Sequence, residues 1–176
     1  MASKRPPAAR KPLTKRRLAN IATYYLQRHA SSIGNVRQVL RRRVRRELAK
    51  DADPAEAIAW IEELIVGFSA RGLLDDRAYA ESKVARDRAF ARPPRRTRAA
   101  LMAKGVAGAI IDQTVRDDGT AEWVAALSLA RRRRLGPFRA TARDRDSDRR
   151  DLAVLGRAGI GFGVAKRVMA MEEPPP

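Results

Sequence analysis

The sequence has no cysteine and only one histidine, His29, among its 176 residues. Without cysteine the chain can form no disulfide bond, thiolate nucleophile or thiolate metal ligand. A single histidine likewise leaves the usual zinc sites and catalytic triads incomplete. We therefore expect a protein that is not an enzyme, holds no metal ion and needs no cofactor.

Aromatic residues are also scarce, at 5% of the chain, although 44% of the residues are hydrophobic. Strands favour aromatic and β-branched residues, whereas Ala and Arg, both frequent here, favour helices. No stretch contains the roughly 20 uninterrupted apolar residues of a membrane span. We predict an all-α protein of the cytoplasm that has no membrane partner.

Acidic residues are few compared with basic ones. The chain has 20 Asp and Glu and 38 Lys and Arg, which gives a net charge of +18. The excess is unevenly distributed. Residues 1–50 carry 15 basic and one acidic side chain, and residues 91–150 carry 15 and seven. By contrast, residues 51–90 carry five basic and nine acidic side chains. A charge of this size predicts a partner with negative charge.

Apolar residues recur at the i, i+3, i+4 spacing of amphipathic helices along most of the chain. The stripes span residues 18–26, 36–48, 58–68, 79–84, 97–104, 110–115, 123–130, 152–155 and 164–169. The stripe at 79–84 is weak and predicts only a short helix. Residues 139–150 alternate Arg with Asp and are expected to be solvated. We expect residues 1–17 to be a disordered basic arm and residues 172–176 a disordered tail.

Stop glycines mark a repeat in the helical pattern. Leu101 stands four residues before Gly105, and Leu155 stands four before Gly159, an offset of 54 residues. Apolar residues also match at five and ten positions after each glycine, and Leu40 takes the place of Leu101 in an earlier unit. We predict an elongated, curved protein of tandem three-helix repeats, whose three units span residues 18–72, 73–119 and 120–171.

A short stretch between the first two units combines a helix stop with a helix start. Gly72 suits the left-handed conformation just after a helix end. Asp75 is placed to cap the next helix, so the acidic pair there is expected to cap and not to bind a metal ion. Leu74 and Tyr79 are expected to pack together across this cap. The whole structural motif comprises Arg71, Gly72, Leu73, Leu74, Asp75, Asp76 and Tyr79.

Guanidinium groups gather on the predicted helices, where they can neutralise phosphates. The candidate partner- or DNA-binding residues are Arg37, Arg41, Arg42, Arg43, Arg45, Arg46, Arg95, Arg96, Arg98, Lys104, Arg131, Arg132, Arg133 and Arg134. The few aromatic residues are expected in the apolar stripes, so binding to single- or double-stranded DNA should be independent of its sequence. Two other interpretations stay open. The arginines pair with carboxylates on a partner protein, or they form only a solvated face.

Four stretches of the chain resemble the RecX family of bacterial regulatory proteins. They are Tyr25-Leu26-Gln27-Arg28, the motif at residues 71–80, Leu101-Met102-Ala103-Lys104-Gly105-Val106, and Leu155-Gly156-Arg157-Ala158-Gly159-Ile160. The resemblance extends over roughly residues 18–171, and the stretch at residues 71–80 is its most specific part.

The resemblance implies a regulator that binds the RecA recombinase, particularly its filament on single-stranded DNA. Members of the family lie in the filament groove and restrain ATP hydrolysis, strand exchange and co-protease activity in recombination and the SOS response. On this basis we expect a monomeric modulator of the recombinase filament. The alternative is a basic helical protein that binds nucleic acid without sequence specificity.

Overall fold

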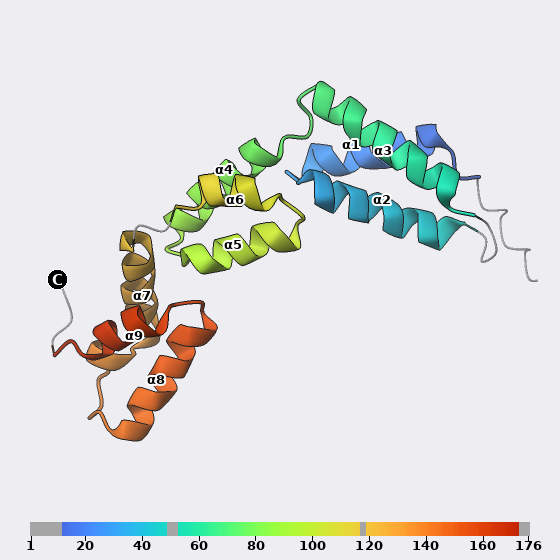
Figure 1. The fold of residues 1–176 in the computed structure, drawn as a ribbon. Helices are drawn as coiled ribbons and strands as arrows, with labels where there is room; N and C mark the ends of the chain where they lie inside the picture. The colour runs from blue at the N-terminus through green and yellow to red at the C-terminus, as the bar shows by residue number, and fades with distance from the viewer. Residues whose placement is uncertain (1–11, 49–52, 117–118, 173–176) are drawn as a thin grey trace, which may run out of the picture. The chain divides into compact units, whose positions relative to one another are not determined.

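A computed structural model describes residues 12–48, 53–116 and 119–172 of the chain (Figure 1). Every regular element within these ranges is a helix, and none of the described residues forms a strand. The predicted all-α class is therefore confirmed. Most of the expected N-terminal arm and C-terminal tail lies outside the described residues.

The chain divides into two compact units, with the boundary between Asp76 and Arg77. The described part of the first unit encloses one hydrophobic core, and that of the second unit encloses two. Three cores fit the three-unit interpretation of the sequence repeat. The predicted unit boundaries, after residues 72 and 119, stay a prediction.

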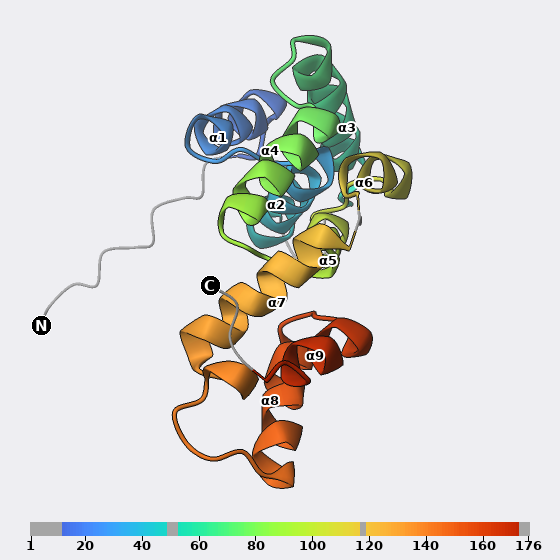
Figure 2. The same cartoon turned by 90° about the vertical axis from the view of Figure 1, so that its left-hand side faces the viewer.

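Three helices build the first unit, namely α1 (Lys15–Arg28), α2 (Ile33–Glu47) and α3 (Ala55–Ala70). The hydroxyls of Thr14 and Ser32 cap α1 and α2, each accepting a hydrogen bond at 3.2 Å from a first-turn amide. All three helices pack on one another (Figures 1 and 2). The core between them consists of Leu18, Ala22, Val36, Leu40, Val44, Ala57, Ile61, Ile65, Phe68 and Leu74.

Gly72 ends α3 as the sequence predicts. Its φ of +69° lies in the left-handed region, which glycine enters without the steric cost that other residues bear. Asp76, four residues on, accepts a hydrogen bond at 2.8 Å from the amide of Ile33. Because Leu74 is also buried in the first core, the stretch after Gly72 is held to both α2 and that core.

The next helix, α4 (Asp76–Ala89), begins directly after Asp75, the predicted capping residue. Tyr79 packs beside the core that includes Ala80, whereas Leu74 belongs to the first core. The expected contact between Leu74 and Tyr79 stays a prediction.

The prediction of only a short helix at residues 79–84 is wrong, since α4 has 14 residues. The physical reason is that one of the buried positions of this helix holds a charged side chain. Ala80 and Asp87 are the two buried residues of α4, seven positions apart on one face. A carboxylate therefore stands where the apolar pattern would have continued.

Two groups of helices make up the second unit. α4, α5 (Pro94–Ala103) and α6 (Gly108–Thr114) surround the smaller core, which consists of Ala80, Leu101, Val106, Ile111 and Val115. Pro94 stands at the first helical position of α5, where its missing amide hydrogen costs nothing.

The second group comprises α7 (Thr120–Arg133), a 3-10 turn η1 (Gly136–Phe138), α8 (Arg145–Arg157) and α9 (Phe162–Met169). Figures 1 and 2 show α8 and α9 side by side next to α7. Their core consists of Ala125, Ala126, Ala130, Leu135, Leu155, Ile160, Ala165, Val168 and Met169.

Most of residues 139–150 are exposed, as the sequence predicts, and α8 begins within this segment. Asp144 and Ser147 form a capping box at the start of α8, in which Asp144 Oδ1 accepts the Ser147 amide at 2.7 Å and Ser147 Oγ accepts the Asp144 amide at 2.9 Å. The hydrogen bond from the Ser147 amide holds the pKa of Asp144 below its ordinary value. Asp144, one of the alternating acidic residues, thus caps the start of a helix.

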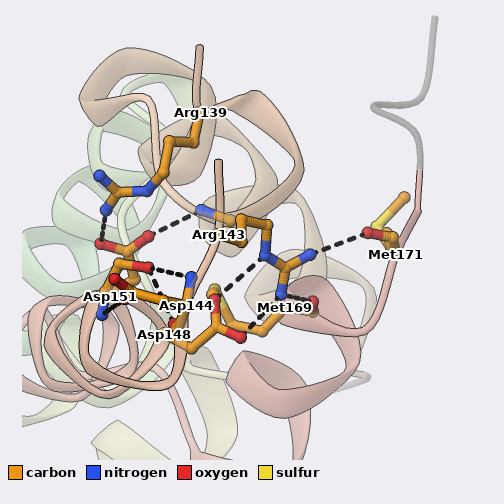
Figure 3. Close-up of polar contacts among 9 residues, drawn as sticks. Arg139, Arg143, Asp144, Asp148, Asp151, Met169 and Met171 are labelled. Carbon is orange, nitrogen blue, oxygen red and sulfur yellow. Dashed lines mark hydrogen bonds and ion pairs between the residues drawn. The ribbon is translucent and has the colours of Figure 1, made fainter. Parts of the chain in front are cut away.

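Arg143 and Arg139 hold the same segment against α8 and α9 (Figure 3). Arg143 donates to the carbonyl of Met169 at 2.5 Å and to both oxygens of Asp148 at 3.1 and 3.2 Å. It thereby satisfies a carbonyl at the end of α9, which has no partner within that helix. Arg139 Nη2 donates to Asp151 Oδ1 at 2.6 Å.

Asp151 is the buried partner of Arg139. Its side chain is 4% exposed, and its second oxygen accepts a hydrogen bond from the amide of Gly136 at 2.9 Å. We expect Asp151→Asn to lower the free energy of unfolding by about 2–3 kcal/mol, because both the ion pair and one acceptor oxygen are lost. Urea titration measures this, with Trp123 fluorescence followed in a Trp60→Phe background so that only the second unit reports.

The matched control is Asp146→Asn in the exposed first turn of α8. This variant should lower the free energy of unfolding by only about 0.5 kcal/mol, which is the usual energy of an exposed charge near a helix terminus. Equal losses for the two variants would contradict a stabilising role of the buried Asp151 carboxylate.

Candidate partner and nucleic-acid interface

The helix α2 presents a basic surface because its apolar residues follow one stripe and arginines occupy most of the remaining positions. Val36, Leu40 and Val44, spaced by four residues, are buried in the first core. Arg41, Arg42, Arg45 and Arg46 are exposed, and Arg37 and Arg43 are half-buried. The six predicted residues of α2 thus lie on the helix as expected, but they differ in what they contact.

Arg37 and Arg41 are paired within the protein. Arg37 Nε donates to Glu62 Oε1 at 2.9 Å and its Nη2 donates to Glu62 Oε2 at 2.9 Å, a bidentate pair between α2 and α3. Arg41 Nη2 adds a bond to Glu62 Oε1 at 3.3 Å. The hydrogen bonds from Arg37 hold the pKa of Glu62 below its ordinary range, and Glu62 in turn raises the pKa of Arg37.

Arg43 is also used internally, because it forms an ion pair with Glu47 one turn further along α2. Arg17 of α1 reaches the same carboxylate, with Nη2 3.2 Å from Glu47 Oε1. Glu47 therefore links two helices of the first unit.

Arg42, Arg45 and Arg46 have no ion-pair partner among the residues that the structure describes. We call these three residues the α2 arginine surface. A cavity of about 470 Å³ adjoins it between α2 and α3, and its walls include Arg41, Arg45, Val44 and Ile58. The surface is therefore a set of charges without ion-pair partners among the described residues, beside a recess that both polar and apolar side chains line.

The predicted basic residues of α5 differ from one another in the same way. Arg98 forms an ion pair with Asp112 and donates to the carbonyl of Val115 at 3.1 Å, so it holds α6 in place. Arg95 and Arg96, in the first turn, and Lys104, just after the helix, are exposed.

The four consecutive arginines at the end of α7 are all exposed. The Arg131 guanidinium carbon lies 5.6 Å from the centre of the Phe138 ring, a cation–π contact. Arg134 ends the helix with a φ of +53°, which is unusual for a residue with a side chain. Arg132 and Arg133 have no ion-pair partner among the described residues.

Asp87 of α4 organises the joint between α4 and α5. Its side chain is 2% exposed and accepts from Thr97 Oγ1 at 2.9 Å, from Arg92 Nη1 at 3.0 Å and from Lys83. Burial alone would raise the pKa of Asp87, but the hydrogen bonds from Lys83 and Thr97 and the nearby charges lower it overall. Arg92 is thereby held in place while about half of its side chain stays exposed.

Sequence reasoning missed Phe90, which follows α4. The aromatic residues were expected in the apolar stripes, but Phe90 is 61% exposed, and Tyr24 and Phe162 are exposed as well. The Arg92 guanidinium carbon lies 5.9 Å from the centre of the Phe90 ring. The signal was present in Arg88-Ala89-Phe90-Ala91-Arg92, since an aromatic residue between arginines is typical of surfaces that bind single strands.

Comparison with known proteins places the chain in a family. No family model matches it. The regulatory protein RecX of Myxococcus xanthus (strain DK1622) is 40% identical to it over 156 residues, which are 86% of this chain and 83% of that protein. The chain belongs to the RecX family of regulatory proteins. RecX of Agrobacterium fabrum (strain C58 / ATCC 33970) is 32% identical over 154 residues, or 86% of this chain and 81% of that protein.

Solved structures agree with this membership at the level of the fold. A crystal structure of RecX from Lactobacillus salivarius has a TM-score of 0.65 at 18% identity and covers 88% of this chain and 94% of that one. A second crystal structure, of a regulatory protein RecX, has a TM-score of 0.66 at 18% identity. The match covers 89% of this chain and 72% of that one. The helical fold of this chain is thus that of RecX structures.

Two further observations concern the described residues alone. None of their helices is long and apolar enough to cross a membrane. They also contain no group of three or more His, Asp or Glu side chains that could hold a metal ion.

The lowered pKa of Asp87 gives a pH-dependent prediction. The unfolded carboxyl titrates near pH 3.9, so the unfolded state takes up a proton before the folded state does as the pH falls. The stability from Asp87 should therefore be fully present above about pH 5 and decline as the pH falls through the lowered folded pKa. Relative to Asp87→Asn, the wild type should be about 3 kcal/mol more stable at neutral pH, and this difference should shrink toward pH 3.

Urea titrations at several pH values measure the difference. Asp112→Asn is the control, since its carboxylate is 70% exposed and its pair with Arg98 is accessible to water. A stability difference for Asp87→Asn that is constant with pH, or that grows in acid, would contradict the role of its ionised form.

Proposed function

We propose that this RecX-family chain binds a RecA-type recombinase, chiefly as its filament on single-stranded DNA, and restrains ATP hydrolysis, strand exchange and co-protease activity. The proposal is supported by membership of a family of regulatory proteins. The observation that carries it is the α2 arginine surface, because Arg42, Arg45 and Arg46 are exposed and lack an ion-pair partner among the described residues.

The chemistry of this surface suits a nucleoprotein partner. A recombinase filament on DNA offers both phosphates and side-chain carboxylates, and guanidinium groups form bidentate pairs with either. Positions 42, 45 and 46 share one face of the helix, since residues three and four apart are neighbours. Three adjacent like charges repel one another, so a partner that neutralises them removes this repulsion and gains affinity.

We also propose that the chain acts as a monomer built of the three predicted units. The three separate hydrophobic cores support this division. Each unit then adds basic residues of its own, in α2, at the start of α5 and at the end of α7.

The second candidate function is binding to nucleic acid without sequence specificity and without a recombinase. Arginines without ion-pair partners among the described residues occur in both units, which favours phosphate contacts of this kind. The two candidates differ in whether the recombinase itself is needed.

Titrating the protein into recombinase assembled on single-stranded DNA, while ATP turnover is followed, separates them. We expect inhibition at protein concentrations that leave bare DNA unbound. Full ATP turnover at those concentrations would contradict the proposed regulation and favour the second candidate.

A charge-reversal variant tests the α2 arginine surface. Arg42→Glu, Arg45→Glu and Arg46→Glu together should weaken binding to the filament by about tenfold or more, because charge-assisted hydrogen bonds are each worth about 1.5–3 kcal/mol. Fluorescence anisotropy on labelled filaments measures the affinity, and circular dichroism checks that the helices remain.

The control reverses two exposed arginines of α8, Arg145→Glu and Arg149→Glu. This control should leave the affinity within about threefold of wild type, since rim charges away from a contact act mainly through the screened long-range field. Equal weakening per reversed charge by the two variants would mean that only net charge matters. No weakening by the α2 variant would leave its arginines a solvated face.

A further inference from the structure

A second recess lies within the second unit, between the α4–α5 joint and α7. It has a volume of about 250 Å³, and its walls include Phe90, Arg92, Arg96, Leu129 and Arg132. Residues of α5, of α7, of the α4–α5 joint and of the α8–α9 joint thus meet at one place. We call this recess the joint pocket.

The charges at the joint pocket are positive, and no acidic side chain is among the described residues that line it. Arg96 and Arg132 are exposed and have no ion-pair partner in the described part of the chain. Arg92 is anchored to Asp87, which Lys83 also neutralises. The pocket therefore holds three guanidinium groups whose charge the protein only partly offsets.

The joint that forms one wall is held in an unusual conformation. Ala91 has a φ of +47°, in the left-handed region that costs a residue with a side chain about 1–2 kcal/mol. The Arg92 amide donates to the carbonyl of Asp87 at 2.8 Å and so closes this turn. The Ala91 amide also donates to the carbonyl of Arg88 at 2.9 Å, so this is the usual left-handed end of a helix, which fixes the position of the pocket wall.

The remaining walls are apolar. Phe90 is exposed at the rim, and Leu129, Ala125 and Pro93 lie among the lining residues. On the far side, a side chain added at Gly159 would lie 3.7 Å from Arg96 Cβ, so the α8–α9 joint supports the residue that carries one of the charges. A flat apolar group and an anion could therefore be bound next to each other.

We propose that the joint pocket binds a nucleotide of single-stranded nucleic acid, with a phosphate at Arg96 and Arg132 and the base stacked on Phe90. Exposed aromatic rings and positive grooves are the two elements by which proteins bind single strands without sequence preference. The joint pocket shares no residue with the α2 arginine surface. It therefore adds a nucleic-acid site to the proposed function without depending on it.

A single strand fits these features better than a duplex or an acidic peptide. In a duplex each base is stacked and paired, so its face is not available to Phe90 without the cost of unstacking. A carboxylate would satisfy the guanidinium groups but would leave the aromatic ring and the apolar walls without a partner. The base and phosphate of one nucleotide match both parts of the pocket.

Binding of a labelled oligothymidine of about 20 nucleotides, with no recombinase present, tests the proposal. Phe90→Ala should weaken binding at least about fivefold, which is the lower end of the effect of losing one stacked base. Arg96→Gln with Arg132→Gln should reduce the slope of log K against log salt concentration by about 0.7 between about 50 and 200 mM salt, since the two arginines share one phosphate and each phosphate contact on a single strand contributes about 0.7. Fluorescence anisotropy gives both quantities.

Arg145→Gln with Arg149→Gln on α8 is the matched control, because it removes the same charge from exposed residues of the same unit. It should change neither the salt dependence nor the affinity by more than about twofold. The proposal is overturned if the Arg96 and Arg132 variant behaves like this control. It is also overturned if Phe90→Ala weakens binding to a duplex as much as to the single strand, or weakens neither.

Because the recombinase is absent from this assay, a negative result leaves the filament proposal untouched. If the protein inhibits the recombinase but the Phe90, Arg96 and Arg132 variants bind the oligonucleotide as the wild type does, the proposed regulation stands and the proposed nucleotide site is wrong.

Discussion

Asp87, Asp151 and Glu62 each accept hydrogen bonds from more than one donor, in a chain that has 20 acidic residues for 38 basic ones. Asp87 and Asp151 are buried, and a buried carboxylate is stable only when its oxygens are hydrogen-bonded and its charge is paired. Each of them stands at a connection between helices. The few carboxylates thereby position the helices and select which arginines are paired within the protein.

The arginines that this selection leaves without an ion-pair partner among the described residues are the ones available to a partner molecule. On α2, Glu62 and Glu47 pair with Arg37, Arg41 and Arg43, so none of the described carboxylates pairs with the other three arginines. In the second unit, Asp87 anchors Arg92 at the rim of the joint pocket, beside two exposed arginines. The paired arginines and the proposed binding arginines are therefore parts of one arrangement, and removing a carboxylate should alter both.

Local backbone rules predicted much of the fold. Gly72, Gly105 and Gly159 all have positive φ and follow helix ends, because only glycine adopts that conformation freely. Apolar periodicity located the helices but failed where a polar residue occupies the core, as at Asp87 in α4. It also missed the exposed Phe90, since a hydrophobic residue carries no mark of its burial, and it could not show which arginines Glu62 would pair with, because that contact joins residues 25 positions apart.

Chemical footprinting of arginines with phenylglyoxal, with and without the recombinase filament, tests the central claim most directly. Mass spectrometry then gives the modification rate of each side chain in the same sample. The account predicts that the filament slows modification of Arg42, Arg45 and Arg46 while Arg145 and Arg149 on α8 react as before. Equal rates for the α2 and α8 arginines in the presence of the filament would contradict it.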